Sequence, residues 1–396
     1  MKNYAQQGYG PKDKLTKGFV SGVISGAILS PKYCNKSAME ERIAEIDDLG
    51  GEILMDPELY AARHIASPNA NLGYLETWKY FKAYRRASLI SGVKVDEFIS
   101  ESLEEQASLD LTGWIARNVY IDAADSIETA ISLNVISQTK IVASKFGNKP
   151  VYATLAMSRE AILDRVGFQD LFDALTAMDT PPDGYYLLVG GDNGRDSGDM
   201  VRSDLHHPKV IAGWMYMNHV LSINGARVIN GYCHLLGPLL GICGAEAAAN
   251  GWHSGLRQFS MSRYVRESTG GRIPLIRYVS APLMARIRQT DYLAYKSVAA
   301  EIANNMPLDA DYEGAEISRT AEALQSWEAI SALCKLLCTG NLAVDLDAAY
   351  LHLSRAAILW KRLQAAGFSQ EIEANMEWLA AVQEGIKIFK EWAEIA

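Results

Sequence analysis

The sequence lacks the marks of several common classes of protein. It contains no Walker loop and no dinucleotide-binding fingerprint, because the glycine-rich stretch at residues 190–199 has neither the spacing nor the context that such motifs need. It also contains no Cys-x-x-Cys, and no His-x-His lies on an expected strand. The five cysteines are odd in number and scattered, which does not fit a disulfide framework. These absences leave no motif that points to a cofactor or to a resident metal.

Positive charge and long apolar runs are also scarce. The formal net charge of −9 argues against a protein that coats nucleic acid through bulk electrostatics. The most apolar stretch near the start, residues 19–29, is too short and too rich in glycine to span a bilayer. Residues 1–17 are polar and do not resemble a leader. We therefore expect a cytoplasmic protein with no membrane association.

What the chain does contain is the balance of a globular protein with a sizeable core. Hydrophobic residues make up 49% and charged residues 21% of its 396 residues. This length fits a barrel domain of about 250 residues with a smaller appendage.

Short apolar runs alternate with helical patterns until eight strands can be counted. Parallel strands that are covered by helices on one face and by a core on the other show such near-continuous apolar runs. The expected strands are residues 20–29, 52–55, 113–120, 151–155, 185–189, 227–232, 245–249 and 274–279. Eight such units predict an α/β fold, a (β/α)₈ TIM-type barrel, and an open doubly wound sheet is the alternative.

Two regions depart from this alternation. Residues 72–109 predict a helical insertion between the second and third strands, and the pattern beyond residue 285 is purely helical. The expected organisation is a barrel domain at 1–285 and an α-helical C-terminal extension at 286–396. The extension is expected to pack on the barrel or to provide the surface for a protein partner or for self-association.

Candidate functional residues follow from the geometry of such barrels, whose active sites lie at the C-terminal ends of the strands. Asp56, Glu58, Tyr60 and Arg63 follow the second expected strand. A carboxylate at this position points toward the barrel mouth, where burial raises its pKa for acid or base chemistry. The glycine- and aspartate-rich loop after the fifth strand adds polar groups for a substrate, namely Asp192, Asn193 and Arg195.

The sixth and seventh expected strands end in further candidates. These are Tyr232, His234, Asn250, Trp252, His253 and Arg257. The two histidines are candidate acid–base groups, and the tryptophan is a candidate stacking surface for a base. His234, His253 and an aspartate would also suit a metal-dependent hydrolase, which is one alternative. Arg277, inside the eighth expected strand, would need a carboxylate partner if it is buried.

The passage RVINGYCHLLGPLLGICGAEAAANGW, residues 227–252, resembles the corresponding region of the tRNA-guanine transglycosylase superfamily. In that family a glycine-bearing strand leads through a short helix to a strand with a nucleophilic aspartate. That aspartate falls here near Ala249 or Asn250, and the cysteine-rich zinc site of the family has no counterpart. The resemblance implies a barrel with transglycosylase-like chemistry that uses other residues, with Asp56 and Asp192 as the substitutes.

The leading hypothesis is an enzyme that acts on a nucleobase, a nucleotide or a nucleic-acid component at the barrel mouth. Asp56 would act as acid, base or nucleophile, while Asp192 and Asn193 would bind polar edges of the substrate. The competing hypothesis is a non-catalytic or sensory barrel subunit of a multiprotein assembly. Whether the chain is an enzyme at all stays open at this point.

Overall fold

The structure is a computed structural model, and it describes residues 1–10, 12–191, 206–252, 254–266, 275–312, 314, 316–370 and 376–395. Among the candidate residues, Asp192, Asn193, Arg195 and His253 lie outside the described residues. Within the described part of the chain, no helix combines the length and the apolar character that crossing a membrane requires.

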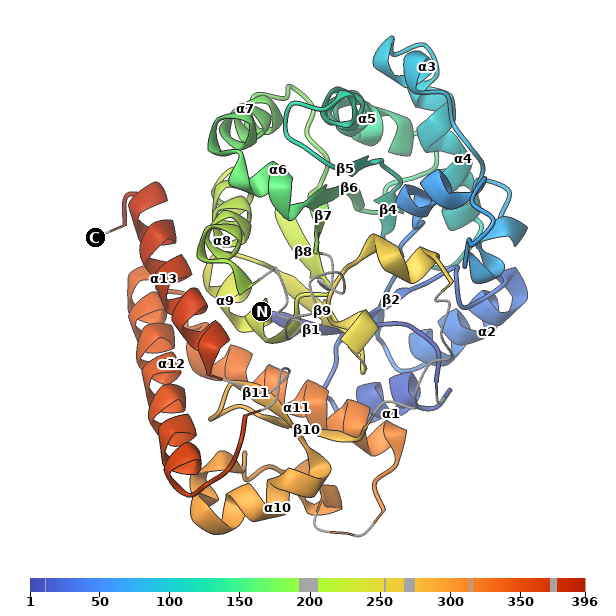
Figure 1. Ribbon diagram of the computed structural model, residues 1–396. Helices are drawn as coiled ribbons and strands as arrows, with labels where there is room; N and C mark the ends of the chain where they lie inside the picture. The colour runs from blue at the N-terminus through green and yellow to red at the C-terminus, as the bar shows by residue number, and fades with distance from the viewer. Residues whose placement is uncertain are drawn as a thin grey trace.

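Eight parallel strands form a nearly closed barrel (Figure 1). In chain order they are β1 (Lys2–Gln6), β2 (Gly26–Leu29), β3 (Glu52–Met55), β4 (Trp114–Ala116), β6 (Val151–Ser158), β7 (Gly184–Gly190), β8 (Arg227–Gly231) and β9 (Ala247–Asn250). A short strand, β5 (Tyr120–Ile121), continues the pairing of β4 along β6. The first strand pairs with β2 on one side and with β9 on the other. Between β3 and β4, the N–H of Thr112 donates to the carbonyl of Ile53 at 2.9 Å, which brings the two edges together.

Helices surround the strands in the order expected for alternating units. They are α1 (Lys14–Val20), α2 (Lys36–Asp47), α5 (Ile127–Ala143), α6 (Arg159–Leu163), α7 (Arg165–Thr176), α8 (Pro208–Ile223) and α9 (Gly237–Ile242). The connection from β3 to β4 holds η1 (Leu59–His64), η2 (Gly73–Thr77), α3 (Arg86–Ile90) and α4 (Val95–Ala107).

The eighth position in the helical ring is filled from far along the chain. Helix α11 (Arg319–Leu337) packs against α1, α9 and β1 (Figure 1). Its Trp327 donates from Nε1 to the carbonyl of Asn250 at 2.9 Å, and Asn3 donates to the carbonyl of Trp327 at 3.0 Å. The barrel and the C-terminal region therefore share one core.

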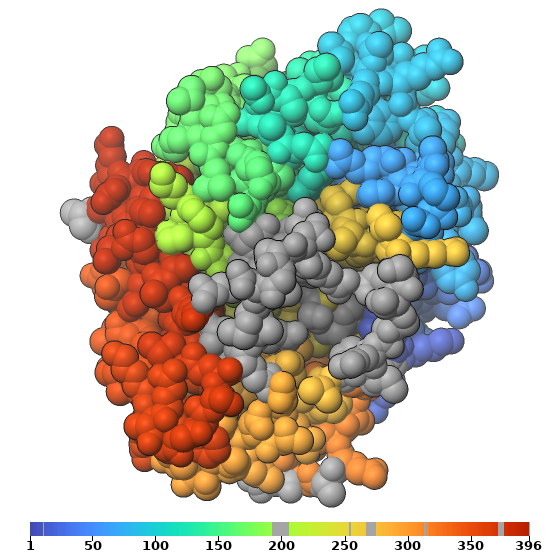
Figure 2. Space-filling model, in the orientation of Figure 1, coloured from blue at the N-terminus to red at the C-terminus, as the bar shows by residue number. Residues whose placement is uncertain are grey.

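The remaining C-terminal elements form a layer beside the barrel. They are β10 (Arg277–Ser280), β11 (Ala285–Arg288), α10 (Gln289–Val298), η7 (Ala300–Ile302), η8 (Pro307–Tyr312), α12 (Leu342–Ala365) and α13 (Glu377–Trp392). Helix α13 lies along α8, where Gly385 permits a close approach to Ile211. In Figure 2 the C-terminal layer, coloured orange to red, lies along one flank of the molecule. The connection between β3 and β4, coloured light blue, lies on the opposite side.

Seven of the eight expected strands overlap strands of the barrel, but one assignment was wrong and one barrel strand was missed. The first barrel strand is Lys2–Gln6, which was missed, and the expected strand at 274–279 overlaps β10, which pairs antiparallel with β11 outside the barrel. Strand β1 was missed because Asn3 and Gln6 are polar, yet both are buried and hydrogen-bonded. Arg277 consequently lies in a hairpin, where its guanidinium donates to the carbonyl of Arg286 at 3.1 Å.

A segment after β9 crosses the C-terminal end of the barrel; we refer to residues 256–266 as the mouth-covering segment. It contains η6 (Met261–Tyr264) and follows η5 (Ser254–Leu256). Backbone bonds fix both of its ends: the N–H of Gly191 donates to Phe259 at 3.1 Å, and the N–H of Asn71 donates to Tyr264 at 2.8 Å. In Figure 1 this gold segment lies in front of the strands.

Candidate functional site

Asp56 lies at the centre of the barrel mouth. It follows β3 directly, and its side chain is fully buried. Its Oδ2 accepts a hydrogen bond from the Tyr60 hydroxyl at 2.6 Å, and the Tyr186 hydroxyl lies 3.2 Å from the same oxygen. Its Oδ1 accepts from the backbone N–H of Glu58 at 2.9 Å. Every one of these partners is uncharged, so the hydrogen bonds that the described residues give this carboxyl group bring no cation to it.

Glu58 provides a second buried carboxylate two residues along the chain. Its backbone has a φ of 49°, in the left-handed region that a non-glycine residue seldom adopts. Its Oε2 accepts from the Ser30 hydroxyl at 2.8 Å and from the N–H of Lys32 at 3.1 Å. Its Oε1 accepts from the Tyr264 hydroxyl at 2.8 Å. Three donors therefore hold this carboxylate in one orientation beside Asp56.

A layer of polar side chains extends across the barrel axis from β1 to β8. Gln6 donates from Nε2 to the Tyr232 hydroxyl at 3.1 Å, and its Oε1 lies 3.3 Å from the Tyr186 hydroxyl. Tyr232 has a φ of 54°, which turns the chain sharply at the end of β8. Strands on opposite sides of the barrel are thus joined through Asp56, Tyr186 and Gln6.

The electrostatics of this cluster favour proton exchange near neutral pH. Burial, and after it the charge of the neighbouring Glu58, raise the pKa of Asp56 to about 7, against the opposite effect of the hydrogen bonds from Tyr60 and Glu58 and the charge of Arg263. Burial, together with Asp56, raises the pKa of Tyr60 far above its ordinary value, so this phenol remains a donor. A carboxyl group with a pKa near 7 suits general acid–base chemistry.

Two cations border the same cluster. Lys32 is buried, and its ammonium donates to the carbonyls of Asn71 and Arg263. Burial lowers the pKa of Lys32 to about 8, with Glu58 opposing that effect. The Arg263 guanidinium lies 4.7 Å from the ring centre of Tyr232. These groups bring positive charge to the two carboxyl groups.

Phe259 of the mouth-covering segment covers the cluster by packing against its tyrosine rings. Its ring is fully buried, with centroid distances of 5.0 Å to Tyr60, 5.6 Å to Tyr232 and 6.0 Å to Tyr120. Asp56 and Glu58 are both 0% exposed under this cover. In the described structure, the carboxyl groups are therefore out of contact with solvent.

A polar cavity of about 250 Å³ lies at the rim of the mouth, beside this seal. Arg63 crosses it to form a paired contact with Asp122, at 3.0 and 2.6 Å. The other lining residues come from the ends of β5, β6 and β7, from α6 and from the mouth-covering segment: Tyr120, Ser158, Glu160, Gly190, Gly191 and Met261. Tyr120 lines this cavity and also contacts Phe259, so the cavity lies next to the buried cluster. We refer to this cavity as the vestibule.

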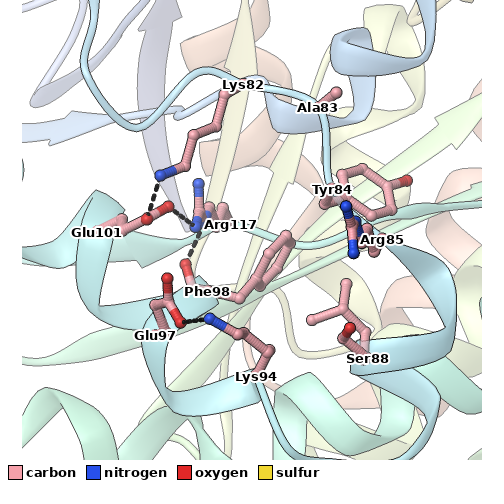
Figure 3. A pocket seen from close by; sticks show the side chains of 11 residues that line it. Lys82, Ala83, Tyr84, Arg85, Ser88, Lys94, Glu97, Phe98, Glu101 and Arg117 are labelled. Atoms are coloured by element: carbon pink, nitrogen blue, oxygen red, sulfur yellow. Dashed lines mark hydrogen bonds and ion pairs between the residues drawn. The ribbon is translucent and has the colours of Figure 1, made fainter.

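A second cavity, of about 280 Å³, lies outside the barrel between α3 and α4 (Figure 3). Ion pairs occupy much of its lining: Glu101 binds Lys82 at 2.5 Å and Arg117 at 2.6 Å, and Lys94 pairs with Glu97. Its charges are largely neutralised within the protein, which makes it a weaker candidate than the mouth.

Several predicted site residues lie elsewhere. Trp252 is buried against Tyr9, with ring centres 5.5 Å apart, and donates to the Tyr9 carbonyl, so its ring is not open to a base. Arg257 is buried and donates to the Ser326 hydroxyl of α11. Asn250 is buried beside Cys233, with its amide nitrogen 3.6 Å from the sulfur.

His234 does not join the Asp56 cluster either. Burial, with Arg257 and Arg286 nearby, holds its pKa well below the ordinary value, which favours the neutral ring. Among the described residues, no group of three or more His, Cys, Asp or Glu side chains is placed to hold a metal ion. His253 lies outside those residues.

Asp56, Tyr60 and Tyr232 are the predicted residues that the fold brings together, and Arg63 lies beside them. Sequence reasoning missed Gln6, Tyr186, Phe259 and Arg263, and it named Glu58 only in passing. Gln6 and Tyr186 could have been found from strand alternation once β1 was recognised. The positions of Phe259 and Arg263 depend on tertiary contacts of a segment without regular periodicity.

No family model matches this chain, and no curated protein sequence does. Among solved structures, it is similar to an HpcH/HpaI aldolase from Desulfitobacterium hafniense, at 9% identity over 63% of this chain and 86% of that one, with a TM-score of 0.35. It is also similar to a β-glycosidase from Thermosphaera aggregans, at 9% identity over 74% and 85%, with a TM-score of 0.34. Likeness at this level says nothing about chemistry, and the barrel is established here by its strand pairing.

Proposed function

We propose that this chain is a barrel enzyme that performs acid–base chemistry at its C-terminal mouth, with Asp56 as the group that exchanges the proton. The observation that carries this proposal is the buried Asp56 carboxyl, whose pKa is raised to about 7 among hydroxyl donors. It lies at the end of the barrel where enzymes of this fold act. A buried carboxyl group whose pKa is raised toward neutrality is typical of acid–base catalysis.

The proposed substrate is a nucleobase derivative, a nucleotide or a nucleic-acid component, and the proposed reaction cleaves its glycosidic bond. Protonated Asp56 would give its proton to the leaving ring nitrogen as the bond from C1′ to that nitrogen breaks. The Glu58 carboxylate would stabilise the positive charge that develops on the sugar. A water molecule, or an incoming base, would then add to C1′ and return a proton to Asp56, which balances the reaction.

Other predicted residues keep subsidiary places in this proposal. Tyr60 and Tyr232 would orient the carboxyl group and the substrate, and Arg63 would act in the vestibule. Asp192, Asn193 and Arg195 would bind polar edges of the substrate, with His253 as a secondary acid–base group. Asn250, Trp252, Arg257 and His234 have no part in it, because the first three pack elsewhere and the last is neutral and apart.

A specific observation favours the alternative of a non-catalytic barrel subunit, namely the complete burial of Asp56 and Glu58 beneath Phe259. In that case the helical C-terminal region would be the docking surface. We propose a division into a barrel at 1–285 and a helical extension at 286–396, with α11 as the part of the extension that completes the barrel.

The test compares the wild type with Asp56→Asn on a panel of nucleosides and nucleoside 5′-monophosphates, with release of free base followed by liquid chromatography and mass spectrometry. We expect base release by the wild type, a loss of at least about 100-fold in Asp56→Asn, and little change in Glu52→Gln at the opposite end of the barrel. Equal turnover by Asp56→Asn and the wild type would remove Asp56 from the mechanism. No turnover by the wild type on any member of the panel would favour the non-catalytic subunit.

A further inference from the structure

The Arg263 guanidinium is buried without the hydrogen bonds that such a group needs. Its side chain is 9% exposed, and none of its three nitrogens has a hydrogen-bond partner among the described residues. The nearest carboxylate oxygen, Oε1 of Glu58, lies 3.8 Å away, which allows an ion pair but no hydrogen bond. A guanidinium carries five N–H donors, and leaving buried donors unsatisfied is costly.

The neighbouring polar groups do not accept hydrogen bonds from Arg263, because they already hydrogen-bond to one another. The oxygens of Glu58 accept from Ser30, from the N–H of Lys32 and from Tyr264. The rings of Tyr232 and Tyr264, at 4.7 and 5.3 Å, stabilise the positive charge of Arg263 but satisfy no N–H group. The N–H groups of Arg263 can therefore donate hydrogen bonds to a ligand in the barrel mouth.

We propose that Arg263 anchors the substrate by binding its carboxylate or phosphate group, so that the site takes a small organic anion. This inference rests on the proposed function, because it concerns the same mouth, and it narrows the substrate class. A planar guanidinium matches the two oxygens of a carboxylate or phosphate with parallel hydrogen bonds. A nucleotide meets this requirement, whereas a neutral free base does not.

The charge balance of the mouth supports an anionic ligand. Lys32 and Arg263 bring two positive charges to the cluster, and with Asp56 protonated Glu58 supplies the one negative charge among the described residues of the cluster. An anion near Arg263 would repel an ionised Asp56, since these two side chains interact electrostatically. Anion binding is therefore coupled to proton uptake, and the affinity should fall as the pH rises through about 7.

The test measures the binding of inorganic phosphate and of acetate, separately, by isothermal titration calorimetry at constant ionic strength and pH 6. We expect at least one anion to bind the wild type, about tenfold or more weaker binding to Arg263→Met, and intermediate binding to Arg263→Lys, which keeps the charge but not the fork. Arg227→Met, at the opposite end of the barrel, is the matched control: this arginine also lies over a tyrosine ring, and the variant should bind like the wild type. The two anions distinguish a phosphate from a carboxylate specificity.

A second readout separates binding from structural damage. Removing an unsatisfied guanidinium should leave the melting temperature of Arg263→Met, without anion, at or above that of the wild type. Titrations of acetate, which is fully ionised at pH 7, in two buffers of different ionisation enthalpy should show proton uptake by the wild type and a loss of that uptake in Asp56→Asn. Wild-type-like binding by Arg263→Met, an equal loss of binding in Arg227→Met, or no binding of either anion to the wild type would each overturn the inference. The catalytic proposal has its own test in the base release by Asp56→Asn, so each can fail separately.

Discussion

Both ends of the barrel contain carboxyl groups that accept hydrogen bonds from tyrosines, but the charged groups around these carboxyl groups differ between the ends. At the N-terminal end, Tyr4 donates to Glu52 at 2.5 Å, and Arg227 forms a two-bond contact with Glu246, at 2.6 Å for each bond. Lys2 joins the two acids by pairing with both. At the C-terminal end, Asp56 also accepts from a tyrosine, but it has a second carboxylate as its neighbour in place of a cation.

The consequence is seen in the direction of the pKa shifts. The hydrogen bonds from Arg227 hold the pKa of Glu246 below its usual value, with Lys2 adding to the effect and burial opposing it. Burial and Glu58 instead raise the pKa of Asp56. A partly exposed carboxylate that is paired with a cation stabilises the fold. A fully buried carboxyl group without a paired cation makes the fold less stable, and its raised pKa suits acid–base chemistry. The two ends therefore differ in that paired carboxylates stabilise one of them, while the other holds a carboxyl group with a raised pKa.

The largest expected effect comes from opening the seal with Phe259→Ala. The loss of a buried ring should lower the free energy of unfolding by about 3–5 kcal/mol and admit water to Asp56. The pKa of Asp56 should then fall toward 4, as measured by carbon NMR of its carboxyl group. Phe168→Ala, in the helical layer, is the control: it should be equally destabilised and leave that pKa unchanged. An Asp56 pKa that stays near 7 in Phe259→Ala would show that burial under this ring is not its cause.

Asp56→Asn should change the pH dependence of stability in a defined direction. In the wild type the folded pKa of about 7 lies above the unfolded value near 4, so stability is lost as the pH rises between these values. The amide carries no charge, and the variant should gain on the order of 2 kcal/mol relative to the wild type between pH 5 and pH 8. Urea unfolding at both pH values measures this gain. A stability difference that does not depend on pH would refute the raised pKa.

Glu246→Gln, at the opposite end, should show a smaller effect with the opposite sign. The lowered pKa of Glu246 means that its stabilisation is present above about pH 4.5 and is lost as the pH falls through the folded value. Because the pair is partly exposed, we expect a loss of about 1 kcal/mol or less at pH 7, reduced further in 1 M salt. Urea unfolding at pH 7 and pH 3.5 is the measurement. If this variant and Asp56→Asn shift in the same direction with pH, the contrast between the two ends does not hold.

The fold could largely be predicted because alternating apolar runs survive in the sequence. The expected strands at 52–55, 151–155, 185–189 and 227–232 overlap β3, β6, β7 and β8. Strand β1 was not recognised in the sequence because its polar residues are buried through tertiary contacts. Gln6 hydrogen-bonds to Tyr232 and Asn3 to the carbonyl of Trp327, and no local sequence pattern encodes these contacts. The run at 274–279 is equally apolar in appearance but forms a hairpin, since hydrophobicity does not specify which sheet a strand joins.

The site could be predicted only in part, for a related reason. Asp56 and Tyr232 each follow a parallel strand, so topology alone places them at one end of the barrel. Arg263 and Phe259 reach the mouth because backbone bonds to Asn71 and Gly191 guide the segment that carries them. Trp252 has a suitable ring and follows β9, yet its indole N–H bonds to the Tyr9 carbonyl and fixes it within the protein. Residue type and strand order indicate candidates, but tertiary hydrogen bonds decide access.

The pairing of β1 with β9 also has a consequence for how this chain reaches its native state during synthesis. Strand β1 ends at Gln6, while its partner ends at Asn250 and the helix that covers both ends at Leu337. At typical elongation rates, β1 waits roughly 10–50 s before β9 exists to pair with it. One edge of β1 has no native partner during that interval, and an unpaired strand edge is a template for association with other chains. The short length of β1, five residues, and the charge of Lys2 at its start make it a poor template during this interval.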